Sequence, residues 1–132
     1  MEPTEIVRTT MPLCDLLDVT ATEFAAERVV LGLPWRPELC TSGGLLHGGA
    51  VMAVADSAGA ACAFLNLPDG ASGTSTIESK TNFVGVITEG VLTATSTPLH
   101  AGRSTVVVET ELRDGSGRLI AKTTQTQAVI TA

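Results

Sequence analysis

The sequence predicts an α+β fold in which an antiparallel sheet wraps around one long central helix. Three observations carry this prediction. Residues 50–65 form an apolar run without Lys or Arg and with a single carboxylate. Segments rich in Val, Thr and Ile then follow one another in quick succession. Between the last two of them, residues 114–117 read Asp-Gly-Ser-Gly, which is a strong signal for a tight hairpin turn.

Length and composition indicate how the core is built. A chain of 132 residues is large enough for one hydrophobic core, so we expect a single domain over residues 1–132, with residues 1–10 as a loosely ordered tail. The chain is 44% apolar but only 3% aromatic and has no Tyr, so the core must consist of Ala, Val, Leu and Ile.

Charge and cysteine content exclude several classes of protein. The net charge of −6 argues against general nucleic-acid binding. Before residue 67 there are 8 acids and 3 bases, against 6 acids and 5 bases after it, so a phosphate-bearing ligand would find basic partners in the C-terminal half. Three cysteines without C-x-x-C spacing indicate neither a disulfide framework nor a zinc site. No signal peptide or segment of transmembrane length is visible, so we expect a soluble, cytoplasmic protein without membrane contact.

The chain before the apolar run has weaker patterns. Residues 11–19 suggest one or two helical turns that start at Pro12, with three residues facing inward: Leu13, Leu16 and Leu17. Residues 20–33 read as one strand, since their second half alternates and gathers β-branched residues. The long connection that follows contains the only Trp, Trp35, for which packing at the core edge is favoured over direct contact with a substrate.

The apolar run itself predicts a buried helix. A Gly-Gly pair, Gly48 and Gly49, opens it, and Pro68 and Gly70 follow its end as stop signals. It is too apolar for a surface helix and, as sixteen residues, too short for a membrane span. We therefore expect a core helix that other elements surround.

Four strands are expected after the helix, and their pattern predicts an antiparallel meander. They cover residues 74–84, 90–97, 104–113 and 118–130. Such a sheet covers the helix on one side only, and its remaining face and edge strands must be paired or charged. Association into a homo-oligomer is the natural solution.

Asp56 is the residue that a purely structural helix does not explain. An ionised carboxylate in an apolar helix is costly unless it finds partners. Helical spacing places Asp56 near a row of small or flexible residues: Gly49, Met52, Ala53, Gly59 and Ala60. About two turns earlier, His47 and Gly48 mark the helix start, where free N–H groups face outward. This combination suggests a site for an anionic or polarised carbonyl group.

The residues Leu46-His47-Gly48-Gly49 and Ala55-Asp56, with the acid nine positions after the histidine, resemble the PaaI-type hotdog-fold acyl-CoA thioesterases. The resemblance extends through residues 76–83, 100–103 and 114–121, and covers the chain from about residue 13 onward. It implies the hotdog fold, in which the sheet wraps a central helix. It also implies dimers whose sheets join edge to edge, often paired into tetramers.

The resemblance further implies the catalytic residues. Asp56 would be the catalytic carboxylate, as nucleophile or general base, and a buried structural Asp is the competing interpretation. Gly48 N–H would be the oxyanion donor, unobstructed by a side chain. His47 would fix the loop and the helix start, with a secondary role in orienting the thioester.

Substrate-binding residues follow in the same way. Thr41 stands where the family often has Asn or Gln, which puts positioning by that residue in doubt because a hydroxyl is shorter. Gly49 belongs to the helix start. Thr76 matches a hydroxyl that assists from the neighbouring subunit, and an ordinary strand Thr is an equal alternative. Arg103 would pair with coenzyme A phosphates, or is a solvated turn residue.

The sequence therefore predicts hydrolysis of an aryl- or short- to medium-chain acyl-CoA to free acid and CoA by a dimer or tetramer. No metal or redox cofactor is implied, and coenzyme A enters only as part of the substrate. The alternative is a hotdog-fold protein that binds an acyl thioester without turnover, which the departures at Thr41 and Ala60 support. A hotdog dehydratase is a third and weaker hypothesis.

Overall fold

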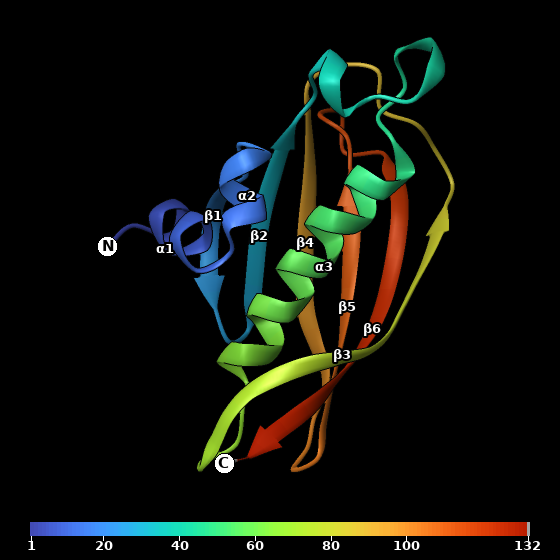
Figure 1. The fold of residues 1–132 in the computed structure, drawn as a ribbon. Coiled ribbons are helices and arrows are strands. Elements are labelled where there is room, and N and C mark those ends of the chain that lie inside the picture. The colour runs from blue at the N-terminus through green and yellow to red at the C-terminus, as the bar shows by residue number, and fades with distance from the viewer. Residues whose placement is uncertain (132) are drawn as a thin grey trace.

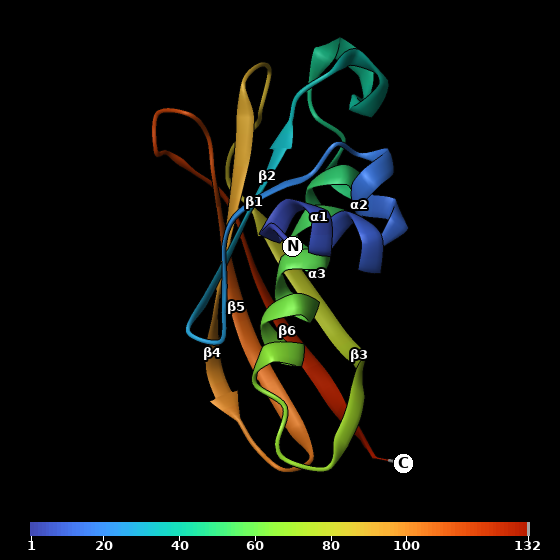
Figure 2. The ribbon, with the colours of Figure 1, turned by 90° about the vertical axis from the view of Figure 1, so that its left-hand side faces the viewer.

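A computed structural model describes residues 1–131 and shows one antiparallel sheet that curls around a central helix (Figure 1). The strands are β1 Thr20–Ala25, β2 Arg28–Pro34, β3 Ala71–Phe83, β4 Val91–Ala101, β5 Thr105–Arg113 and β6 Leu119–Thr131. The helices are α1 Pro3–Thr10, α2 Pro12–Leu16 and α3 Gly48–Leu65, with short 3-10 turns at Pro37–Leu39 and Ser42–Gly44. All three α-helices lie on the same side of the sheet (Figure 2). This is the architecture that the sequence predicts.

The strand order is β1-β2-β4-β5-β6-β3, which corrects the expected meander in one respect. Strands β4, β5 and β6 do form consecutive hairpins, but β3 pairs with β6 at the far edge, from Ala71 opposite Thr131 to Phe83 opposite Ala121. Strands that follow one another in the chain are neighbours only about two-thirds of the time. The sequence contained no signal that β3 pairs with β6 and not with β4. Because of this pairing, β3 is an edge strand beside α3.

The expected single strand over residues 20–33 is wrong, because this segment is the β1–β2 hairpin. Phe24 pairs with Val29 and Ala25 pairs with Arg28, so Ala26 and Glu27 form the turn. Neither residue is among those that usually mark a two-residue hairpin turn. Without a recognisable turn signal between them, the two strands therefore read as one.

The expected loose tail over residues 1–10 is also wrong, because residues 3–10 form α1. Pro3 stands in its first turn and Val7 is fully buried. Arg8 Nε donates to the Val19 carbonyl at 2.8 Å, and the Thr4 hydroxyl accepts the Ala21 N–H at 3.0 Å. These two hydrogen bonds fix α1 to the start of β1. They join residues that are 11 and 17 positions apart in the chain, which is too far for a local sequence pattern to predict.

Helix α2 confirms the short helix expected in residues 11–19, but its buried side differs from the prediction. Leu17 is buried as expected, whereas Leu13 is 50% and Leu16 is 69% exposed. Cys14 is fully buried instead. One inward cysteine and two outward leucines show that apolar character alone does not fix the orientation of a helix this short.

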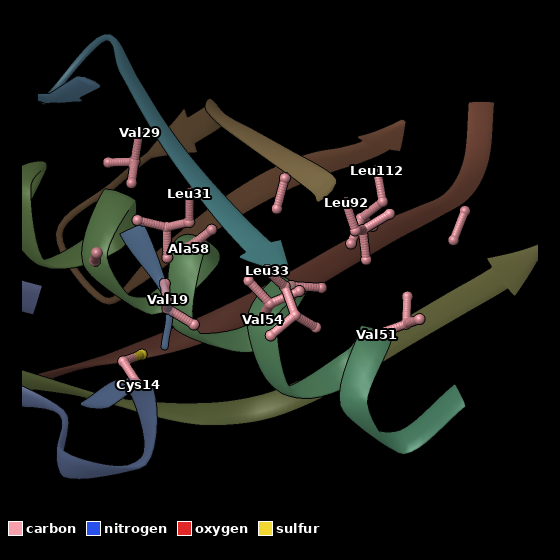
Figure 3. Close-up of a cluster of buried hydrophobic side chains, with 14 of the residues drawn as sticks. Cys14, Val19, Val29, Leu31, Leu33, Val51, Val54, Ala58, Leu92 and Leu112 are labelled. Carbon is pink, nitrogen blue, oxygen red and sulfur yellow. The ribbon is translucent and has the colours of Figure 1, made fainter. Parts of the chain in front are cut away.

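The core lies between α3 and the inner face of the sheet (Figure 3). Val54, Ala58 and Cys62 of α3 are fully buried, as are Leu31 and Leu33 of β2. Small helix residues let the strands approach closely, which is how a core with few aromatic side chains reaches a dense packing.

Helix α3 begins at Gly48, as the Gly48-Gly49 pair predicted, and ends at Leu65. Its 18 residues, with a mean hydropathy of 1.5, are long and apolar enough to cross a membrane by those two measures, which corrects the expectation that the run is too short. Half of this helix is buried inside the protein.

The predicted turn at residues 114–117 is confirmed. Asp114 Oδ1 accepts the N–H groups of Ser116 and Arg118, both at 3.0 Å, and Gly117 has a φ of +86°. Hydrogen bonds from the Ser116 side chain and from the Arg118 backbone lower the pKa of the Asp114 carboxyl. The carboxylate thus replaces backbone partners in a tight turn.

Candidate active site

His47 is the N-cap of α3. Its Nδ1 accepts the Gly49 N–H at 2.7 Å, while its carbonyl accepts the N–H groups of Ala50 and Val51. The N–H of Gly48, the first helical residue, donates to no acceptor within residues 1–131. A helix start therefore presents one free donor with the positive end of the helix dipole behind it.

A pocket of about 210 Å³ lies at this helix start. Gly48 and Thr41 both line it, together with apolar side chains that include Phe83 and Ile120. Nearby, Trp35 Nε1 donates to the Gly44 carbonyl at 3.0 Å and the indole packs against the core. This favours the core-edge interpretation of Trp35, which ties down the glycine-rich loop before the helix.

Asp56 is exposed, and one of its oxygens is held by two side chains. Gln125 Nε2 on β6 donates to Asp56 Oδ1, and the Thr76 hydroxyl on β3 lies 3.5 Å from the same oxygen. Gln127 Nε2 in turn donates to Thr76 Oγ1 at 2.7 Å. The carboxylate is therefore oriented by the sheet and is not sealed inside the monomer.

Sequence reasoning did not identify Gln125, Gln127 or the close approach of Gly59. Both glutamines are 1% exposed, and their side chains point inward from β6. A Cβ at Gly59 would lie 1.9 Å from Gln125 Oε1, so only glycine leaves room for this amide. Two signals were available: a glycine inside a helix, and glutamines at inward positions of a strand.

The structure separates the sequence-predicted site residues into two groups. Thr41, Gly48, His47 and Gly49 lie at the start of α3, whereas Asp56 lies opposite Thr76, two turns along the helix. At 1.5 Å per residue, eight residues place Asp56 about 12 Å along the axis from Gly48. The Gly48 pocket does not include Asp56.

Two further features lie outside the Gly48 pocket. Arg103 lies in the β4–β5 turn, at the opposite end of the sheet from Gly48 (Figure 1). On the Asp56 side of the helix, an apolar pocket of about 340 Å³ begins one turn further on, at Ala60. Its lining comes from four elements: Ile6, Thr10 and Met11 around α1, Phe24 of β1, Ala60, Ala61, Phe64 and Leu65 of α3, and Thr74 of β3. Thr74 and Thr76 share one face of β3.

Comparisons with known proteins show the family to which the chain belongs. The family described as "Thioesterase superfamily" matches residues 43–121. A protein of Saccharolobus solfataricus named "Putative esterase SSO2140" is 34% identical over 118 residues, which are 89% of this chain and 83% of that protein. "Putative esterase ComA2" of Bacillus subtilis is 32% identical over 118 residues, which are 89% of this chain and 94% of that protein.

A solved structure extends the similarity to three dimensions. A mutant of the thioesterase PA1618 from Pseudomonas aeruginosa superimposes with a TM-score of 0.90 at 25% identity. The match covers 100% of this chain and 96% of that one.

Proposed function

The chain belongs to the thioesterase superfamily and has the hotdog fold, and from this premise we propose that it hydrolyses an acyl-CoA to free acid and CoA. The observation that carries the proposal is Asp56: an exposed carboxylate with one oxygen fixed by Gln125 and Thr76. An oriented acid at the surface is what a thioesterase needs as base or nucleophile. Gly48 N–H supplies the oxyanion donor.

The site requires two copies of the chain. An oxyanion donor lies 2.7–3.1 Å from the carbonyl oxygen, and a reacting group lies about 3–3.5 Å from the carbonyl carbon. Gly48 and Asp56 of one chain are about 12 Å apart along the helix axis, so they cannot act on the same carbonyl. Each site therefore combines Gly48 of one subunit with Asp56 of another.

The edge strand β3 supports such an assembly. It has 13 residues and a free edge, next to the α3 face that bears Asp56. Two of its apolar side chains are exposed, Ile77 by 62% and Phe83 by 47%. Long free edges that expose apolar side chains are normally covered, so we propose that β3 joins two subunits in a dimer, alone or within a tetramer.

Two chemical routes are open to Asp56. As a general base, the carboxylate accepts a proton from water, the resulting hydroxide adds to the carbonyl carbon, and Gly48 N–H stabilises the oxyanion. The C–S bond then breaks, and the CoA thiolate takes the proton back from Asp56. As a nucleophile, the carboxylate displaces the CoA thiolate and forms a mixed anhydride, which water hydrolyses to the acid and free Asp56.

The acyl group enters the apolar pocket that begins at Ala60. Its volume of about 340 Å³ is at the lower end of the range for small-molecule sites, which suits an aryl group or a short to medium chain. We assign the CoA phosphates to Arg103, whose guanidinium can pair with them. Because Arg103 and Gly48 of one chain are at opposite ends of the sheet (Figure 1), this contact also needs another subunit.

The central experiment measures thiol release from aryl-, short- and medium-chain acyl-CoAs. We expect turnover by the natural chain and its loss by a factor of at least about 10²–10⁴ in Asp56→Asn. Mixing inactive Asp56→Asn with inactive Gly48→Pro should restore activity, because a mixed dimer contains one site with both groups intact. Full activity of Asp56→Asn alone would rule out the mechanism. Absence of restoration in demonstrably mixed dimers would rule out the two-chain site.

A second function, binding of an acyl thioester without turnover, is favoured by one observation. Thr41 lines the Gly48 pocket at the position where a longer amide side chain is common in the family. A hydroxyl does not reach as far toward a bound carbonyl. Tight binding of acyl-CoAs by calorimetry, without thiol release for any of them, would establish this function instead.

A further inference from the structure

Gln125 has a conformation that only a neighbouring acceptor explains. The side chain is 1% exposed, its Nε2 donates to Asp56 Oδ1, and its buried Oε1 has no hydrogen-bond partner within residues 1–131. A buried amide oxygen without a partner is unfavourable. An ionised carboxylate only accepts hydrogen bonds, so the amide must present its N–H side to Asp56 and its oxygen to α3.

Gly59 makes this orientation possible. Gln125 Oε1 occupies the space in which a Cβ at Gly59 would stand, at 1.9 Å, and Val108 Cγ2 lies 3.2 Å from the same point. Glycine inside a helix is less favourable than alanine. The helix therefore carries its least stabilising residue one turn after Asp56, at the place where the glutamine amide lies.

A second glutamine acts on the same oxygen through a hydroxyl. Gln127 Nε2 donates to Thr76 Oγ1 at 2.7 Å, which leaves the Thr76 proton to point toward Asp56 Oδ1, 3.5 Å away. Both donors thus converge on Oδ1. No hydrogen bond from residues 1–131 reaches Asp56 Oδ2.

We propose that Gln125, accommodated by Gly59, is the positioning residue that holds Asp56 by Oδ1 and keeps Oδ2 free as the reactive oxygen. This proposal rests on the function proposed above and adds to it the part of the sheet that aims the carboxylate. When a catalytic carboxylate is displaced from the carbonyl by about 1 Å, the reaction rate falls by a factor on the order of a hundred. Because Gln125 is 1% exposed, we expect no contact between its side chain and the substrate, and therefore unchanged substrate binding.

The test uses three variants of the full chain and a matched control. Gln125→Leu removes the donor, and Gly59→Ala displaces the amide while Gln125 is still present. The double variant Gly59→Ala/Gln125→Ala lacks the glutamine amide that the new Cβ at position 59 would displace. Thr123→Val is the control, because Thr123 is a fully buried polar residue of the same strand whose hydroxyl bonds to Thr81 and not to Asp56.

We expect kcat to fall at least tenfold in Gln125→Leu and in Gly59→Ala, with KM within about twofold of the natural value. The double variant should lose no more than Gly59→Ala alone, because both of its changes act through one contact. Thr123→Val should retain kcat within about twofold. Unchanged kcat in Gln125→Leu, or multiplied losses in the double variant, would overturn the proposal.

A structural readout separates this proposal from the proposed function. If Asp56→Asn is inactive but Gln125→Leu is fully active, the thioesterase mechanism stands and the positioning role fails. If no acyl-CoA is turned over, a crystal structure of Gln125→Leu still decides the positioning role. An Asp56 side chain that changes its rotamer in this variant, or divides among several rotamers, supports the role, and an unchanged carboxylate refutes it.

Discussion

His47 Nδ1 accepts the Gly49 N–H at 2.7 Å, so the imidazole caps the same helix start that leaves Gly48 N–H without a partner within residues 1–131. The nitrogen that accepts this bond must be unprotonated. His47 therefore has a structural role at the helix start. The effects of its replacement on stability and on catalytic activity can be measured separately.

His47→Ala should destabilise the protein, and His47→Asn should not. Loss of an N-cap costs about 1 kcal/mol, while Asn is among the best capping residues. Denaturant unfolding of the two variants measures the difference. If His47→Asn restores stability and also activity, the histidine acts through the cap. Activity lost in both variants would instead indicate a direct contact of the imidazole with the thioester.

Gly48→Pro tests the oxyanion donor without breaking the helix. Proline is well tolerated at the first helical position, and the extended conformation of His47, with φ −61° and ψ 135°, suits the residue before proline. Removal of this single N–H should lower kcat by about 10²–10³.

Gly48→Ala is the matched control. It keeps the N–H, and the new Cβ would lie 3.4 Å from Phe83 Cζ, an ordinary contact. We expect kcat within about threefold of the natural value, which is well short of the loss of a donor. Equal losses in the two variants would show that the backbone donor is not the cause.

Ala60→Leu should shorten the acyl group that the protein accepts. The larger side chain projects into the pocket of about 340 Å³, and each excluded methylene costs about 0.8 kcal/mol of binding. Values of kcat/KM across a chain-length series should fall about tenfold or more for the longest good substrate and stay within about twofold for the shortest. Ala101→Leu, at an exposed position at the end of β4, is the control. A uniform loss across the series would exclude this pocket as the acyl site.

Thiol labelling should distinguish the three cysteines. Burial raises the pKa of Cys62 to about 11 and also raises that of Cys14. At pH 8 only about one Cys62 thiol in a thousand is then ionised, and the thiolate is the reactive form. Cys40 is only partly buried, so mass spectrometry should find one iodoacetamide label per native chain, at Cys40. Labelling of Cys62 should increase as the pH approaches 11 or when the chain unfolds, and fast labelling at pH 8 would contradict its burial.

Local sequence determined helix α3, strands β5 and β6 and the positions of His47 and Asp56 on or beside that helix. Three signals act over only a few residues each: the glycines before the apolar run, the run itself and the Asp-Gly-Ser-Gly turn. Periodicity and capping rules therefore locate α3, β5 and β6. The spacing of His47 and Asp56 supported the family resemblance for the same reason, since it is a property of one helix.

Only the tertiary structure decided how these parts combine. The bond between Gln125 and Asp56 joins residues 69 apart in the chain, and β3 pairs with β6 from Ala71 opposite Thr131 to Phe83 opposite Ala121. The burial of Val7, which makes an ordered helix of the N-terminus, depends likewise on contacts with β1. Such contacts form only when the strands of the sheet are ordered side by side, and no local pattern encodes that order. The sequence alone pointed to Asp56 and Thr76, whereas Gln125 and Gln127, which complete the hydrogen-bond network around the carboxylate, were found only in the folded chain.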